Sequence, residues 1–77
     1  MVTAFVLINV EDQKLQDILT RIKAYEGIKE VHVVAGEYDM VAVARVDDNT
    51  KLASLLTDRL IHTPGVKRTK TLISLQD

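Results

Sequence analysis

The chain has 77 residues, a net charge of −1 from 10 basic and 11 acidic residues, and no cysteine. A chain of this length forms one small domain, and it buries only about 60% of its unfolded surface. Without cysteine it has no disulfide and no thiolate metal site, and its balanced charge argues against a nucleic-acid surface. Because small domains without such supports often oligomerise, we expect an oligomer.

The sequence shows neither a targeting segment nor a metal-binding motif. The apolar stretch 2–10 is too short to span a membrane, and it lacks the charged start and cleavage site of a signal peptide. We therefore expect a cytoplasmic protein that does not associate with membranes. The two histidines, His32 and His62, lie far apart without ligand spacing, so we expect no metal and no cofactor.

The first half of the chain begins with a strand and a helix. Residues 2–10 are rich in valine, isoleucine and phenylalanine and predict a strand. Glu11 and Asp12 offer a helix start, because acidic residues favour the positive end of the helix dipole. Apolar residues follow at helical spacing: Leu15, Ile18, Leu19 and Ile22. Gly27 is placed to end this helix in a left-handed conformation.

The remaining elements repeat this order after a hairpin. Strands are predicted over 28–35 and 38–46, and the segment between them, Ala35 to Asp39, is too short for anything but a hairpin connection. Residues 47–50 offer several N-caps for a second helix. Its apolar stripe is Leu52, Leu55, Leu56 and Leu60. Residues 63–65, Thr-Pro-Gly, end it, and 66–75 predict a fourth strand.

The order strand, helix, strand, strand, helix, strand predicts the fold. It is the α+β, ferredoxin-like βαββαβ arrangement, a four-stranded antiparallel sheet with two helices on one face. No linker or repeat divides the sequence, so we expect one domain over 1–77.

The face of the sheet opposite the helices is predicted to be apolar as well. In the first strand Ala4, Val6 and Ile8 lie on one face, and Phe5 and Leu7 on the other. The third strand also carries apolar residues on both faces: Val41 and Val43 on one, and Met40, Ala42, Ala44 and Val46 on the other. Helices cover one face only, and the second would expose a patch on the order of several hundred Å², large for a monomer. We therefore expect a dimer formed through this face, the alternative being that the small residues tolerate solvent.

Catalytic chemistry finds little support, and we predict no catalytic residue. There is no cysteine, no glycine-rich phosphate loop and no serine in a nucleophile setting. Glu37 and Asp39 could act as a carboxylate pair in acid–base chemistry or could be surface charge on a turn. Thr69 and Thr71 face the same side of the last strand, where their hydroxyls could hold a small ligand or simply reflect strand propensity.

Two short motifs resemble one known family. The first is the turn 34–39, Val-Ala-Gly-Glu-Tyr-Asp, and the second is Gly65-Val66-x-x-Thr69-x-Thr71-x-Ile73-x-Leu75. Together they resemble the effector domain of the Lrp/AsnC transcription regulators, also called the RAM domain, and the resemblance covers essentially the whole chain. It implies a βαββαβ fold, dimers formed by face-to-face sheets, and rings of dimers, commonly octamers or decamers.

The resemblance also implies an amino-acid site between dimers. It would consist of six residues: Gly36, Glu37, Tyr38, Asp39, Thr69 and Thr71. Gly36 would allow close backbone approach, and Tyr38 would form a wall. Asp39 would pair with the ligand's α-amino group, the threonines would offer hydroxyls, and Glu37 would tune selectivity.

One departure from the family shapes the expected function. Full-length members carry an N-terminal helix-turn-helix, and this sequence begins at the first effector strand. We therefore expect a stand-alone amino-acid sensor without direct nucleic-acid binding, whose candidate partner is a full-length Lrp/AsnC regulator. Two alternatives remain: a small dimeric enzyme of this fold, monooxygenase-like or isomerase-like, and an ACT-like interaction module without a ligand.

Overall fold

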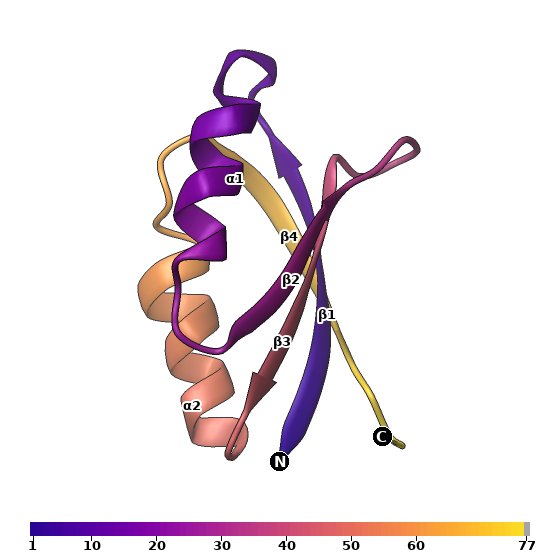
Figure 1. The fold of residues 1–77 in the computed structure, drawn as a ribbon, viewed down its shortest axis with the longest axis vertical. Coiled ribbons are helices and arrows are strands. Elements are labelled where there is room, and N and C mark those ends of the chain that lie inside the picture. The colour runs from indigo at the N-terminus through magenta and orange to yellow at the C-terminus, as the bar shows by residue number, and fades with distance from the viewer. Residues whose placement is uncertain (77) are drawn as a thin grey trace.

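A computed structural model describes residues 1–76 and shows one four-stranded antiparallel sheet. Its strands lie in the order β2-β3-β1-β4, with bounds β1 (Val2–Val10), β2 (Ile28–Val33), β3 (Met40–Val46) and β4 (Val66–Ile73). A short 3₁₀ turn, η1 (Asp12–Lys14), leads into α1 (Leu15–Lys23). Figure 1 shows α1 and the second helix on the same face of the sheet. The predicted ferredoxin-like βαββαβ fold is confirmed.

The core lies between this face and the helices. Alternate residues of β1 and β3 point into it, and all are fully buried: Ala4, Val6, Ile8, Met40, Ala42 and Ala44. They pack with Ile18 and Ile22 from α1 and with leucines of the second helix. The predicted alternation of β1 and β3, which pair at the centre of the sheet, is therefore confirmed.

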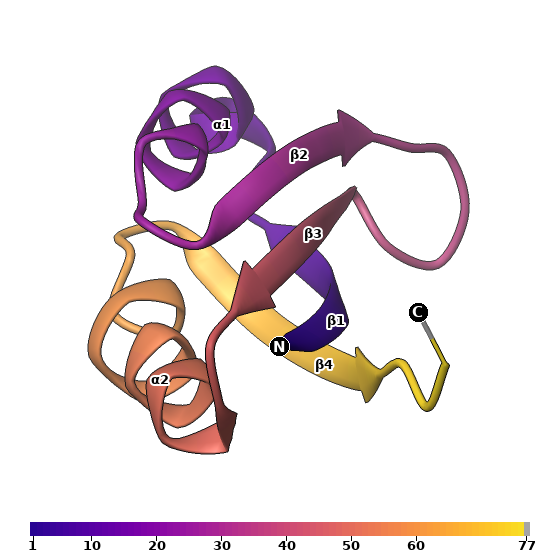
Figure 2. The same cartoon turned by 60° about the horizontal axis from the view of Figure 1, so that its bottom comes forward.

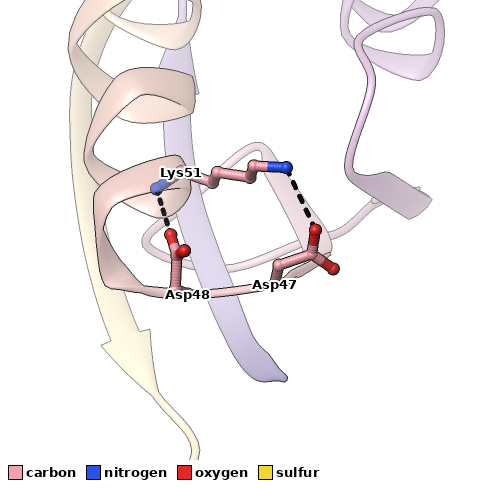
Figure 3. A network of polar contacts seen from close by, with 3 residues as sticks. All are labelled: Asp47, Asp48 and Lys51. Carbon is pink, nitrogen blue, oxygen red and sulfur yellow. Dashed lines mark hydrogen bonds and ion pairs between the residues drawn. The ribbon is translucent and has the colours of Figure 1, made fainter.

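The second helix starts with a side-chain cap. Asp48 accepts a hydrogen bond from the backbone N–H of Lys51 at 2.9 Å, which starts α2 (Asn49–Ser54), as Figure 3 shows. This satisfies one of the free N–H groups of the first turn. The Lys51 Nζ also donates to Asp47 at 3.0 Å, four residues back. The predicted cap within 47–50 is thus Asp48.

The same helix then widens into a π-helix, η2 (Leu55–Leu60). The N–H of Ile61 donates to the carbonyl of Leu56, five residues back, at 3.1 Å. Residues five apart diverge around an α-helix, but the wider π turn brings them close to the same side. Leu55 and Leu60 are consequently both buried in the core. The sequence predicted the leucine stripe but not the change of helix type.

Several element boundaries differ from those predicted. β2 ends at Val33 rather than residue 35, β3 begins at Met40 rather than 38, and β4 ends at Ile73 rather than 75. The first helix ends at Lys23, and Gly27 (φ +96°) is the last residue of the turn before β2 instead of the residue that ends the helix. No helix within residues 1–76 is long and apolar enough to cross a membrane.

A bulge changes the faces of β2. Ile28 pairs with Ala44 and Glu30 with Val43, so Lys29 is an extra residue in the ladder. Without the bulge, simple alternation would place Ile28 on the same face as His32. Ile28 instead turns toward the helices, whereas Glu30 and His32 lie on the opposite face.

The Asp48 cap should contribute measurably to stability. We expect Asp48→Ala to lower the free energy of unfolding by about 1 kcal/mol, because the first turn loses its acceptor. Asp47→Ala, which removes only the exposed ion pair, is the matched control and should have a smaller effect. Urea unfolding followed by circular dichroism at fixed protein concentration measures both, and equal effects would contradict this role for Asp48.

Candidate functional site

The face of the sheet away from the helices, called here the open face, has an apolar centre. Its members come from the three strands β1, β3 and β4 and follow the ladder register: Phe5, Leu7, Val41, Val43 and Leu72. Phe5 is 39% exposed and Leu72 48% exposed, and the other three are half-buried. Figures 1 and 2 show both helices on the other face of the sheet, so no helix within residues 1–76 covers the open face.

The two edges of the open face carry opposite charges. On the β2 edge Glu30 lies in the row of Val43, and its carboxylate is 2.9 Å from the ring nitrogen of His32. On the β4 edge Arg68 lies opposite Asn9, and Lys70 opposite Leu7. The open face therefore runs from an acidic edge across an apolar centre to a basic edge.

The loop between β2 and β3, residues 34–39, is attached to the end of β1. The Asp39 N–H donates to the Ile8 carbonyl at 3.0 Å, and the Asp39 carboxylate accepts from the Val10 N–H at 2.9 Å. The Asn9 side-chain amide donates to the Glu37 carbonyl at 2.9 Å. Three consecutive residues of β1 thus hold the loop. The register of β1 with β4 also shifts between Asn9 and Val10, so the ladder is irregular here.

The four predicted loop residues lie together on this attached segment. Gly36 has φ +142°, and an added Cβ would meet no atom within 4 Å, so the backbone conformation rather than crowding favours glycine there. The Glu37 side chain is exposed, and Tyr38 and Asp39 are half-buried. Figure 2 shows the loop curling away from the helices, on the side of the open face.

The predicted threonine pair lies elsewhere in the protomer. Thr69 pairs with Ile8 and Thr71 with Val6, so both face the helix side of β4. The expectation that they share one face is confirmed. Because β4 and β2 are opposite edges of the sheet, one protomer does not bring this pair together with the loop.

A cleft among the described residues lies at the other end of the domain. It has a volume of about 500 Å³ and opens between the α1–β2 turn and the second helix. Four cationic side chains line it, Lys29, Arg45, Lys51 and Arg59, together with three carboxylates. The hydrogen bond and charge of Lys51 lower the pKa of Asp47, and Asp47 in turn raises the pKa of Lys51. None of the six predicted site residues lines this cleft or a second one near Pro64.

Comparison with known proteins identifies the family. Residues 3–77 match the family described as the Lrp/AsnC ligand binding domain. The HTH-type transcriptional regulator FL11 of Pyrococcus abyssi is 38% identical over 73 residues, which cover 95% of this chain and 48% of that protein. This chain belongs to the Lrp/AsnC family. The chain spans about half the length of the curated relatives it matches.

Solved structures agree with this assignment of an Lrp/AsnC domain. The protein TTHA0845 of Thermus thermophilus is 35% identical with a TM-score of 0.95, and the match covers 100% of this chain and 96% of that one. The feast or famine regulatory protein of M. tuberculosis, solved with L-methionine, is 32% identical with a TM-score of 0.83. That match covers 100% of this chain and 52% of the mycobacterial one. The family is one of regulator domains rather than enzymes.

Asn9 is a residue of the candidate loop site that sequence reasoning missed. It attaches the loop to β1, and its Oδ1 is buried without a hydrogen-bond partner among residues 1–76. The available signal was a polar side chain at the end of an otherwise apolar strand. That signal marks the position but not the loop carbonyl that the side chain reaches.

Removing the Asp39 carboxylate should loosen the loop. In Asp39→Ala the Val10 N–H loses its charged acceptor, a bond worth about 1.5 kcal/mol or more. We expect amide hydrogen exchange at Val10 to accelerate about tenfold or more. Glu37→Ala is the control, because the bond from Asn9 uses its backbone carbonyl and the side chain is exposed. Unchanged exchange at Val10 in Asp39→Ala would refute this attachment.

Proposed function

We propose that this domain senses a small amino acid at the interface between dimers in a ring of four or five dimers. The observation that carries the proposal is the attached loop: residues 36–39 are held by three residues of β1, yet they line neither of the two clefts described above among residues 1–76. A ligand enclosed at this loop needs walls from another subunit. The family match and the L-methionine complex of the mycobacterial relative support an amino acid as ligand.

The loop offers groups suited to an amino acid. The Asp39 carboxylate uses one oxygen for Val10 and keeps further acceptor capacity for an α-ammonium group. The open space around Gly36 leaves room for the approach of a ligand or a neighbouring chain. In this proposal Tyr38 forms a wall and Glu37 tunes side-chain selectivity. Thr69 and Thr71 contribute their hydroxyls from a neighbouring subunit, because their own protomer holds them away from its loop.

The dimer within the ring forms through the open face. Its exposed apolar centre suits a second copy, and a twofold axis parallel to the strands lays β2 of one protomer over β4 of the other. Glu30 of one copy then meets the basic edge, Arg68 and Lys70, of the other. The alternative axis, across the strands, would bring like edges together, so the charge pattern favours the first arrangement.

Ligand binding would act on assembly or on a partner. An amino acid shifts an equilibrium only as far as it binds one state better than the other. A full-length Lrp/AsnC regulator is the proposed partner, since its effector sheet would offer a similar face. Direct nucleic-acid binding is not part of the proposal, in line with the net charge of −1. The domain is proposed to act without catalysis and without a cofactor.

The sensing function is tested by calorimetry with the twenty amino acids, L-methionine included, while light scattering follows particle mass. We expect at least one amino acid to bind. Asp39→Asn should weaken that binding about tenfold or more, because the amide can still accept from Val10 but has lost its charge. Asp17→Asn, on the exposed side of α1, is the matched control. If no amino acid produces heat or a change in mass, an ACT-like module without ligand is the better description.

Charge reversal tests the dimer and its axis. We expect Glu30→Lys and Lys70→Glu each to weaken the dimer about three- to fivefold at low salt, and the double variant to recover most of that loss. Sedimentation velocity over a dilution series measures the dissociation constants. A double variant no better than the singles would exclude the proposed axis, and a monomer at all concentrations would exclude the dimer.

A further inference from the structure

Asn9 connects two regions that otherwise lie apart. Its side chain belongs to the open face, since it follows Phe5 and Leu7 at alternate positions of β1 and pairs with Arg68 across the ladder. Its Nδ2 leaves that face to donate to the Glu37 carbonyl of the loop. One side chain therefore lies on the open face and holds the candidate ligand loop.

The other end of the same amide lacks a donor. Asn9 Oδ1 is buried, and no group within residues 1–76 donates to it. A buried acceptor without a partner carries a penalty, and because Oδ1 is already enclosed in the single protomer, a donor on a second copy cannot reach it. Among residues 1–76 the amide is therefore held through Nδ2 alone, by the exposed bond to the Glu37 carbonyl. A second copy packed on the open face would cover this bond and exclude water from it.

We propose that Asn9 is a positioning residue that couples packing of two open faces to the conformation of the 34–39 loop. Covering the Asn9–Glu37 bond excludes water from it and strengthens it, because a hydrogen bond is stronger in surroundings of low dielectric constant. Nδ2 then stays on the Glu37 carbonyl, and the loop is held in one conformation. The inference rests on the proposed function, because it assumes both the dimer through the open face and a ligand site at the loop.

The coupling has a reciprocal consequence. If an amino acid binds only the ordered loop, it favours the dimer by the same factor by which the dimer favours ligand binding. Removing the Asn9 amide should abolish this factor: the dimer still forms, and the ligand binds with the lower affinity of the uncoupled loop. This result would distinguish a coupling role from a purely structural one. Loss of a purely structural residue would lower stability without changing the mutual effect of ligand binding and dimerisation.

Hydrogen exchange tests the proposal without any ligand. The N–H groups of Asp39 and Val34, which bond within the loop and to β1, report its closure. In the wild-type chain we expect them to exchange about fivefold or more slowly above the dimer dissociation constant than below it. In Asn9→Ala, and in Asn9→Leu, which keeps the open face apolar, this dependence on concentration should disappear.

The control is Leu72→Ala. Leu72 lies on β4 opposite Phe5, so this change alters the open face away from the loop. It should weaken the dimer and keep the slower exchange wherever dimer is present. Loop exchange that follows dimerisation in both Asn9 variants as in the wild type would overturn the proposal, as would wild-type exchange independent of concentration. Circular dichroism establishes that the variants fold. If Asn9→Ala does not fold, Asn9→Leu provides the test.

Calorimetric measurement of amino-acid binding distinguishes failure of this inference from failure of the proposed sensing function. For L-methionine or another amino acid that binds, we expect wild-type affinity to rise with protein concentration, and Asn9→Leu to bind about tenfold more weakly at concentrations where the wild type is dimeric. If no amino acid binds, the sensing function fails while the exchange result still decides the role of Asn9. If ligand binds equally to the wild type and Asn9→Leu, sensing stands and the coupling is wrong.

Discussion

The central strand β1 is paired along both edges and carries apolar side chains on both faces, and this arrangement constrains the rest of the domain. Ala4, Val6 and Ile8 are fully buried under the helices, so the residues between them, Phe5 and Leu7, face the other way. Its last three residues hold the 34–39 loop through the bonds at Ile8, Asn9 and Val10. The core, the open face and the candidate ligand loop therefore share one strand, and a change in one region reaches the others over a few residues.

Much of the fold could be predicted because its signals are local. Alternation of apolar residues in β1 and β3, helical spacing from Leu15 to Ile22 and the cap at Asp48 each depend on a few neighbouring residues. The misses arose where packing overrides local pattern. The extra residue Lys29 reverses the face of Ile28, and the core draws Leu55 and Leu60 to one side by widening the helix. Neither effect is encoded in spacing alone.

The candidate site was only half predictable for a similar reason. Residues 36–39 adjoin in sequence, so their motif identified one segment of the structure. The threonine pair shares the predicted face, but its position on the far edge strand depends on sheet order and on copies of the chain that a single sequence does not place. Asn9 was missed because its partner, Glu37, lies 28 residues away and offers a backbone carbonyl, which has no sequence signature.

In the proposed dimer, the opposite charges at the two edges of the open face would also affect how fast two copies meet. With Glu30 on the β2 side and Arg68 and Lys70 on the β4 side, each protomer carries a dipole across its strands although its net charge is only −1. Such a dipole orients approaching molecules before contact, and the resulting gain in association rate fades as the Debye length shrinks with added salt. The apolar centre, which salt does not screen, governs how long the encounter lasts. The charged edges would thus act mainly on the association rate and the apolar centre mainly on the lifetime of the dimer, and both enter its dissociation constant.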